Sequence, residues 1–265
     1  MIVVGELINA SRTRVGEALA GQDGDYIQKV ARDQFVAGAD YIDVNAGIFV
    51  EEEPEYIAWL VDKVQKAVDA PCSIDSPSPR AIEAALAVHR GTPMINSISL
   101  ERERYQALLP IVAGTDFKIV ALCMSDDGMP ETVDDRLAIA DKLVNGLVQH
   151  HVDIDNIYVD PLVQPISTNR DFGRGFLDAI EQIVKRFEGI HTMCGLSNIS
   201  FGLPNRLFLN QLFAVMAIGR GLDGLIVNPL DQRMMANMIA AEALVGRDEY
   251  CLAYLQGHRT GRFAL

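Results

Sequence analysis

Residues 72–89, CSIDSPSPRAIEAALAVH, contain the structural unit from which the fold can be predicted. The short apolar run Cys72–Asp75 is typical of a strand that is buried on both faces. The turn and cap residues Ser76-Pro77-Ser78-Pro79 follow it and precede an amphipathic stretch, Arg80–His89, which we expect to be helical. Strand, turn and helix in this order form the repeating unit of a parallel α/β sheet.

The same unit recurs along the whole chain. Short runs rich in Val and Ile predict strands, and apolar residues spaced at a 3.6-residue period predict helices between them. The expected strands are Ile2–Glu6, Asp40–Asn45, Cys72–Asp75, Met94–Ser97, Phe117–Met124, Asn156–Asp160, Thr192–Ser197 and Asp223–Asn228. The expected helices are Tyr26–Val36, Glu55–Val68, Arg80–His89, Glu101–Val112, Asp134–Gln149, Phe172–Phe187, Leu207–Ile218 and Gln232–Leu244.

This succession of strands and helices predicts a single (β/α)8 TIM barrel. Such barrels run to about 250 residues, and this chain has 265. An open doubly wound sheet is the alternative, but the sequence lacks the GxGxxG phosphate turn that this fold often carries after its first strand. No linker-like composition marks a boundary, so we expect one domain over residues 1–265. The only tail, Gly257–Leu265, is expected either to be mobile or to pack on a neighbour.

Charge and composition exclude several classes of protein. The chain has 36 acidic and 23 basic side chains, a formal net charge of −13, which argues against binding nucleic acid or an anionic membrane. No apolar run reaches the roughly 18 residues of a membrane span, and the N-terminus does not resemble a signal peptide. The four cysteines show no CxxC pairing, so we expect reduced thiols and a cytoplasmic protein.

Polar residues at the expected strand ends are the strongest functional feature of the sequence. In a TIM barrel the chemistry lies where the strands end, and one polar residue there can simply cap the next helix. Carboxylates or carboxamides at nearly every strand end are harder to explain by capping. They suit a flat heterocycle with several N–H donors and a carbonyl acceptor. The residues concerned are Glu6, Asp43, Asn45, Asp75, Asn96, Asp160, Asn198 and Asn228.

We expect different roles for three of these carboxylates. Asp75 and Asp160 each end an apolar strand and are followed within two residues by proline, which stops strand pairing, so we favour a functional role for both. For Asp43, hydrogen bonding to neighbouring loop backbone is an equally weighted alternative. The carboxylates could also hold Mg²⁺, but their interleaving with Asn is explained as well by a neutral polar ligand, so we expect no metal site.

Residue types that are missing from the strand ends exclude other chemistries. None of the six lysines ends a strand, so a Schiff-base aldolase would have no nucleophile. The five histidines are expected in helices, connections or the tail, which argues against a His-based metal site or general base. No Arg or Lys at the seventh and eighth strand ends is placed to clamp a phosphate.

The strand-end runs resemble a known family. They are Asp43-Val44-Asn45-Ala46-Gly47, Ile74-Asp75-Ser76, Ile95-Asn96-Ser97, Tyr158-Val159-Asp160-Pro161 and Gly195-Leu196-Ser197-Asn198-Ile199-Ser200-Phe201-Gly202. In order and spacing they are similar to those of the methyltetrahydrofolate:corrinoid methyltransferases, a pterin-binding family that includes the corrinoid/iron–sulfur protein methyltransferase and the folate domain of cobalamin-dependent methionine synthase. The resemblance covers essentially the whole chain.

The resemblance implies roles for individual residues. It implies that Asp75, Asn96 and Asp160 bind the pterin ring and that Asn198 contacts N5 and assists catalysis. It further implies that a secondary group surrounds the pterin and the folate tail, namely Glu6, Asp43, Gly195, Ser197 and Arg206.

The resemblance also implies substrates and partners. They are 5-methyltetrahydrofolate or tetrahydrofolate, and a corrinoid that is free or, as we prefer, bound to a separate protein, because this chain lacks the Asp-x-His-x-x-Gly motif of cobalamin domains. A homodimer, anaerobic one-carbon metabolism and the demethylation of compounds such as glycine betaine or methoxy aromatics are further expectations. The alternatives are a dihydropteroate synthase-like enzyme and a non-catalytic folate-binding partner of a corrinoid protein.

Overall fold

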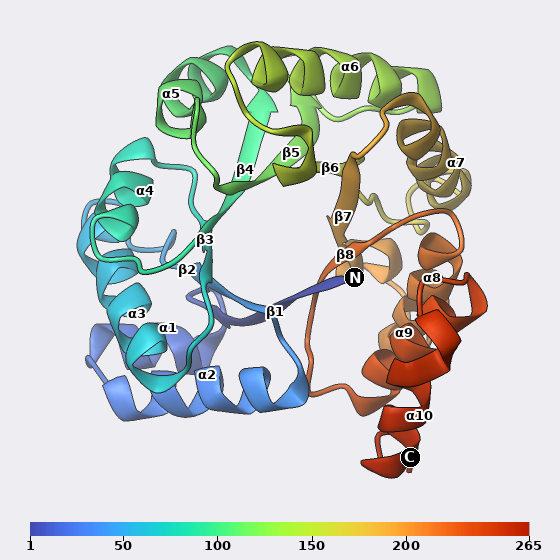
Figure 1. The fold of residues 1–265 in the computed structure, drawn as a ribbon. Helices are drawn as coiled ribbons and strands as arrows, with labels where there is room; N and C mark the ends of the chain where they lie inside the picture. The colour runs from blue at the N-terminus through green and yellow to red at the C-terminus, as the bar shows by residue number, and fades with distance from the viewer. Residues whose placement is uncertain (265) are drawn as a thin grey trace.

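The computed structural model describes residues 1–264 and is a closed barrel of eight parallel strands surrounded by helices (Figure 1). Neighbours in sequence are neighbours in the sheet, and the first strand pairs with the last. The strands are β1 (Ile2–Asn9), β2 (Tyr41–Asn45), β3 (Cys72–Asp75), β4 (Met94–Leu100), β5 (Lys118–Ser125), β6 (Ile157–Asp160), β7 (His191–Gly195) and β8 (Gly224–Val227). The predicted TIM barrel is therefore confirmed.

The helices form the outer wall. They are α1 (Thr13–Ala20), α2 (Gly24–Ala37), α3 (Glu53–Ala67), α4 (Pro79–Leu86), α5 (Arg102–Val112), α6 (Val133–Gln149), α7 (Phe172–Arg186), α8 (Arg206–Ile218), α9 (Gln232–Leu244) and α10 (Leu252–Arg259), with 3₁₀ turns η1 (Ile154–Asn156), η2 (Leu196–Ser200) and η3 (Glu249–Cys251). Each of the eight predicted helices is present, and their ends differ by a few residues. Helices α1 and α10, of eight residues each, were not predicted.

Several predicted strand ends are wrong, and β-bulges explain two of them. Strand β1 continues past Glu6 because its register with β2 shifts between Gly5 and Ile8. Strand β4 continues past Ser97 to Leu100 with similar shifts against β5. A bulge adds a residue and re-aims the side chains that follow, which an apolar run alone does not reveal. Ser197 and Asn198 lie beyond β7, in the turn η2.

Inward-facing side chains divide the barrel interior into an apolar and a polar part. Val4, Tyr41, Met94, Val120, Tyr158 and Met193 form a buried cluster from six strands. Two residues further along the same strands, Glu6, Asp43, Asn96, Leu122, Asp160 and Gly195 occupy the next inward positions. Side chains alternate between the two faces of a strand, so this spacing puts both sets inside the barrel. The apolar cluster fills the floor, and the polar residues line the mouth.

The end of the barrel opposite the mouth holds an ion-pair cluster. His191 was predicted to lie in a connection, but it is the first residue of β7. Its Nδ1 lies 2.5 Å from Asp223 Oδ2, its Nε2 lies 3.1 Å from Asp155 Oδ1, and its ring stacks on Tyr158. These hydrogen bonds to the two carboxylates raise the pKa of His191. Residues at this face of a TIM barrel contribute to stability rather than to chemistry.

The tail folds against the wall of the barrel as far as Ala264. The Arg262 guanidinium donates to the carbonyls of Val36 (3.2 Å) and Ala37 (2.8 Å) at the end of α2. Phe263 stacks on Tyr254 of α10, with 4.7 Å between ring centroids. Leu265 lies outside the described residues. Among residues 1–264, no helix combines the length and the hydropathy that spanning a bilayer requires.

Candidate functional site

A buried pair at the centre of the mouth links β2 to β4. Asp43 Oδ1 accepts hydrogen bonds from Ser73 Oγ (2.7 Å) and from Asn96 Nδ2 (3.2 Å). Asp43 is only 4% exposed, so its partners are side chains of neighbouring strands and not the loop backbone that we weighed as the alternative. Burial, followed by the nearby charge of Asp75, raises the pKa of Asp43 well above its ordinary value.

Asp75, at the end of β3, has one oxygen engaged and one directed to the cavity side. Its Oδ2 accepts a hydrogen bond from Asn45 Nδ2 at 3.0 Å, and Asn45 Oδ1 in turn accepts from the amide of Gly47. Burial raises the pKa of Asp75, whereas the Asn45 hydrogen bond and the charge of Arg104 lower it. Asp75 lines the large cavity of the mouth, so it is accessible to a ligand.

Asp160, at the end of β6, is a second buried carboxylate of the mouth. It is buried, and burial raises its pKa to about 7, although the backbone amides of Leu162 and Gly195 hydrogen-bond to it. The amide of Leu162 reaches Asp160 Oδ1 at 2.8 Å because Leu162 adopts a left-handed conformation, with φ of 65°. Backbone conformations of this kind are costly for residues other than glycine and collect at functional sites. Since Gly195 belongs to β7, Asp160 also ties two neighbouring strands together.

Glu6 occupies the opposite side of the mouth. Its Oε1 accepts a hydrogen bond from Arg12 Nη2 at 2.9 Å. Burial raises the pKa of Glu6, and the charges of Arg12 and Arg206 oppose that change. Glu6 and Ser197 line the same small cavity, together with Asn228. Glu6 also contributes to the raised pKa of Asp43, so the carboxylates of β1, β2 and β3 lie within electrostatic reach of one another.

The turn η2 carries the remaining predicted residues. Asn198 lies in the middle of this turn and is exposed, and its carbonyl accepts a hydrogen bond from the amide of Phe201. Arg206, the first residue of α8, donates from Nη2 to the carbonyl of Ser197 (2.7 Å) and from Nε to Ser200 Oγ (3.1 Å). The Arg206 guanidinium therefore supports the turn that presents Asn198.

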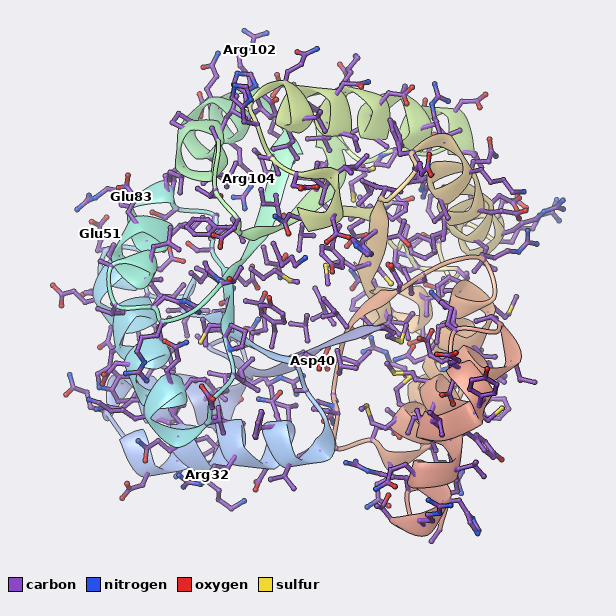
Figure 2. All side chains as sticks on the ribbon, viewed as in Figure 1. Arg32, Asp40, Glu51, Glu83, Arg102 and Arg104 are labelled. Carbon is purple, nitrogen blue, oxygen red and sulfur yellow. The ribbon has the colours of Figure 1, made fainter. Side chains whose placement is uncertain are left out.

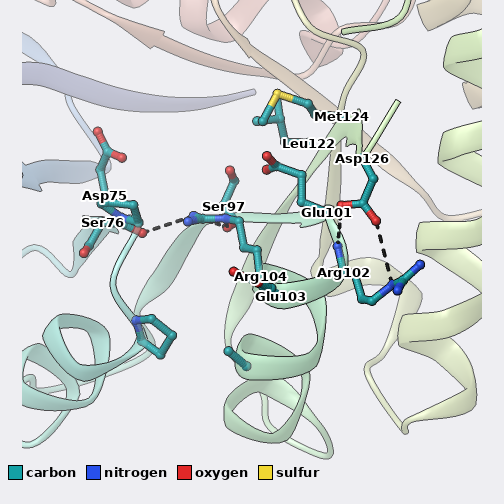
Figure 3. A pocket seen from close by; sticks show the side chains of 13 residues that line it. Asp75, Ser76, Ser97, Glu101, Arg102, Glu103, Arg104, Leu122, Met124 and Asp126 are labelled. Carbon is teal, nitrogen blue, oxygen red and sulfur yellow. Dashed lines mark hydrogen bonds and ion pairs between the residues drawn. The ribbon is translucent and has the colours of Figure 1, made fainter. Parts of the chain in front are cut away.

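A cavity of about 1040 Å³ opens beside Asp75, between the ends of β3, β4 and β5 (Figure 3). Its lining includes residues that were not predicted: Leu122 and Met124 of β5, and Glu101, Arg102 and Arg104 at the start of α5. Leu122 and Met124 follow Val120 at every second position, so alternation along β5 could have identified them. Arg104 had no comparable feature in the sequence, since it lies on a helix, distant in sequence from the strand ends that it contacts.

The predicted site residues therefore fall into three linked groups. Asp43, Asn96 and Asp75 form one group at β2–β4, Asp160 and Gly195 form a second at β6–β7, and Glu6, Ser197 and Arg206 surround the third side. Asn198 stands above them in η2. Within residues 1–264, no group of three or more His, Cys, Asp or Glu side chains is arranged to hold a metal ion.

Sequence comparison places the chain among pterin-dependent proteins. The family model described as "Pterin binding enzyme" matches residues 5–228. The chain is 35% identical over 264 residues to methylcorrinoid:tetrahydrofolate methyltransferase of Eubacterium limosum, covering 99% of this chain and 97% of that protein. It is 29% identical over 241 residues to methionine synthase of Mycobacterium leprae (strain TN), covering 86% of this chain and 20% of that longer protein.

Structural comparison finds the same barrel in enzymes of low sequence identity. The dihydropteroate synthase of Yersinia pestis, solved with a sulfonamide drug complex, has a TM-score of 0.72 at 17% identity and covers 92% of this chain and 93% of its own. The dihydropteroate synthase of Coxiella burnetii, solved with pteroic acid, has a TM-score of 0.73 at 16% identity, covering 93% and 94%. At these identities the likeness concerns the fold alone.

Proposed function

The chain belongs to the family of pterin-binding enzymes, and from this premise we propose that it transfers a methyl group between N5 of 5-methyltetrahydrofolate and the cobalt of a corrinoid. The observation that carries the proposal is the convergence of Asp75, Asn96 and Asp160 at one mouth. Acceptor and amide groups from three strands suit the N–H donors and the carbonyl of a pterin edge. The relative from Eubacterium limosum, similar over nearly the full length of both chains, supports the choice of reaction.

The carboxylates would bind the pterin as hydrogen-bond acceptors. Asn45 holds one oxygen of Asp75, which leaves the other for a ligand N–H group. Asp160 accepts from the amides of Leu162 and Gly195, and its two oxygens have further lone pairs for a ligand. The neutral Asn96 amide has two N–H donors and one carbonyl acceptor, and only one of the donors is used by Asp43. In this arrangement we propose that N5 faces the exposed turn that carries Asn198.

The transfer step makes one main demand on the protein. The methyl carbon leaves N5 for Co(I), which supplies both electrons of the new Co–C bond, and the electron pair of the broken C–N bond stays on N5. Expelled without a proton, N5 would be an unstable anion, so a hydrogen bond or proton must develop there by the transition state. In the reverse direction the N5 lone pair attacks the methyl group, and N5 loses its proton.

We propose that Asn198 donates the hydrogen bond and that the buried carboxylates hold the proton. An amide donor at N5 strengthens as the nitrogen gains electron density, but Asn cannot itself supply a proton. Near neutral pH, the raised pKa of Asp160, about 7, and of Asp43 keep protons in the mouth. Solvent would replenish them through the open cavity.

Replacing Asn198 tests this assignment. Asn198→Ala should lower the rate of methyl transfer by about 10²–10³-fold, the usual effect of losing one transition-state donor, while tetrahydrofolate affinity changes little. Single-turnover kinetics and calorimetry measure the two quantities separately. A variant that turns over at the wild-type rate would remove Asn198 from the mechanism.

The corrinoid would be carried by a separate protein that docks over the mouth. Four βα loops around the mouth carry exposed apolar side chains, namely Ile48, Val50, Met129, Phe201 and Leu230. Apolar groups grouped around a polar cavity are typical of a protein interaction surface. We place the reaction in the reducing cytoplasm of an anaerobe, in one-carbon metabolism or the demethylation of methylated compounds, where the four free thiols stay reduced.

We also propose a homodimer that forms through α8. Phe208, Leu212 and Met216 are exposed at i, i+4 and i+8 and form a continuous apolar stripe on that helix. Leu212→Glu should convert the dimer to a monomer in light scattering coupled to size-exclusion chromatography, because it places a charge within the stripe. A wild-type protein that is monomeric at micromolar concentration would contradict the proposal.

One assay separates this function from its alternatives. Incubation with 5-methyltetrahydrofolate and Co(I) cobalamin should yield tetrahydrofolate and methylcobalamin. A dihydropteroate synthase would instead condense a pterin diphosphate with 4-aminobenzoate, and a non-catalytic folate-binding protein would form neither product. The nearest cation to the β7 end, Arg206, already holds Ser197 and Ser200, which disfavours a diphosphate there.

A further inference from the structure

Arg104 and Arg136 lie near the mouth and bind main-chain carbonyls instead of the carboxylates beside them, whereas Arg12 pairs directly with Glu6. Arg104, in the first turn of α5, donates from Nε to the carbonyl of Ser97 (2.9 Å) and from Nη2 to the carbonyls of Ser97 and Ser76 (3.1 Å for Ser76) (Figure 3). Ser76 directly follows Asp75, and Ser97 directly follows Asn96. One guanidinium therefore fixes the backbone next to two of the residues proposed to bind the pterin.

Arg136 makes the equivalent contact at β6. This fully buried residue of α6 donates from Nε to the carbonyl of Pro161 (2.9 Å) and from Nη2 to Gln164 Oε1 (2.9 Å). Pro161 directly follows Asp160 and precedes Leu162, whose left-handed backbone carries the amide that binds Asp160. A left-handed conformation is unfavourable for a residue other than glycine, so neighbouring contacts must hold it.

Because each arginine binds the backbone and not the carboxylate, the carboxylate oxygens stay available to a ligand. If either arginine paired with its carboxylate, it would occupy the oxygens that a ligand needs, and such pairs are strong. Held on the backbone, each positive charge instead acts at a distance: Arg104 lowers the pKa of Asp75 and Arg136 lowers that of Asp160, each in opposition to the larger effect of burial. In Figure 2, Arg104 points inward, whereas Arg102 points away from the molecule.

We propose that Arg104 and Arg136 are positioning residues of the pterin site, each fixing the main-chain carbonyl beside a ligand-binding carboxylate while leaving that carboxylate free. Arg206 holds Ser197, next to Asn198, in the same way. The inference rests on the proposed function, since it takes a pterin as the ligand. Lysine at either position would keep the charge but could not reproduce the guanidinium fork.

A double-mutant cycle on tetrahydrofolate binding tests the inference. Arg104→Lys should weaken binding about tenfold, equivalent to about 1.4 kcal/mol, because Asp75 loses its fixed geometry. In an Asp75→Asn background the same change should cost about twofold or less. In an Asp160→Asn background it should again cost about tenfold, since Arg104 does not touch β6. Arg136→Lys should show the reverse pattern, coupling to Asp160 and not to Asp75.

A second readout separates positioning from general support of the fold. Arg104→Gln removes the charge, so the pKa of Asp75 should rise further and the pH midpoint of tetrahydrofolate binding should move to higher pH. Arg104→Lys keeps the charge and should leave this midpoint unchanged while affinity falls. Arg174→Lys, on the exposed surface of α7, is the matched control and should alter neither quantity.

The outcomes distinguish the inference from the proposed function. Equal losses in matched and crossed backgrounds, or wild-type affinity in Arg104→Lys, would overturn the inference. If Arg136→Lys fails to fold, the Arg104 cycle decides alone, since Arg104 is only partly buried. Wild-type protein that does not bind tetrahydrofolate would overturn the proposed function, and the inference with it.

Discussion

At the scale of single residues, the protonation of the buried Asp160 is linked to the stability of the fold. Its pKa in the folded protein is about 7, above the ordinary value of 3.8, so the folded state binds this proton more tightly than the unfolded chain does. The stability that this provides is complete below about pH 4 and is lost as the pH rises through about 7. At pH 8 the ligand-free protein therefore holds a buried charge that two backbone amides and the charge of Arg136 only partly offset.

Replacing Asp160 with Asn should relieve that cost. We expect Asp160→Asn to stabilise the ligand-free protein at pH 8 by about 1–3 kcal/mol and to have a much smaller effect at pH 5. His191, whose raised pKa also favours stability at low pH, is common to both proteins and cancels in the difference. Urea denaturation at the two pH values measures the effect. Equal stabilities of wild type and variant at pH 8 would show that Asp160 carries no such cost.

The residue types at the strand ends predicted that polar side chains gather at the mouth, but not which of them stabilise loops and which face the cavity. Asn228 was grouped with the others, yet its Oδ1 accepts a hydrogen bond from the amide of Leu230 and so stabilises its own loop. Asp43 lies beneath Asn96, which it orients through a hydrogen bond. A sequence shows which side chain ends a strand, but the depth of that side chain depends on the stagger between strands, which is set by the whole barrel.

At the scale of the elements, β1 shows that hydrophobic periodicity does not predict irregularities within a strand. The register of β1 with β2 shifts between Gly5 and Ile8, and the strand continues to Asn9, so Glu6 lies within the strand and not at its end. Gln34, buried on α2, stabilises this bulge by accepting a hydrogen bond from the amide of Leu7 at 2.9 Å. In the sequence, Gln34 is one polar residue on an otherwise apolar helix face, and nothing links it to β1. The contact between Gln34 and Leu7 could therefore not be predicted.

The close packing at this bulge yields a prediction. A Cβ on Gly5 would lie 2.5 Å from Gln34 Oε1 and 3.3 Å from Ala39 Cβ, so Gly5→Ala should destabilise the protein by about 1–3 kcal/mol. Gln34→Ala alone should also destabilise it, because the Leu7 amide loses its acceptor. The double variant should be more stable than the sum of the two predicts, since removing Gln34 makes room for the methyl group. Additive losses in urea denaturation would contradict this account.

For the whole molecule, the alternation of short apolar and longer amphipathic segments was enough to predict a TIM barrel. Parallel strands that are covered on both faces leave few other ways to bury eight such units. The two short outer helices, α1 and α10, and the packed tail were not predicted, because α1 has three buried residues and α10 has one, too few to distinguish a short helix from a loop. The contact of Arg262 with the end of α2 joins residues more than 220 positions apart.

The apolar surface around the mouth gives a prediction about the partner. Phe201→Glu should slow methyl transfer with a corrinoid protein, because it places a charge in the expected interface, but should leave transfer with free cobalamin unchanged. Val148→Glu is the matched control, because Val148 is also an exposed apolar residue but lies at the C-terminal end of α6, away from the mouth. Equal rates for wild type and Phe201→Glu with a corrinoid protein would show that the partner docks elsewhere.

The central claim, methyl transfer at this mouth, is tested most directly by rapid mixing of excess protein with 5-methyltetrahydrofolate and Co(I) cobalamin. The absorption of Co(I) should decay as that of methyl-Co(III) grows, with one methyl group transferred per cobalt. Asn198→Ala should slow this conversion about 10²–10³-fold while it still binds tetrahydrofolate. Wild-type protein that binds tetrahydrofolate but leaves the Co(I) spectrum unchanged would contradict the claim.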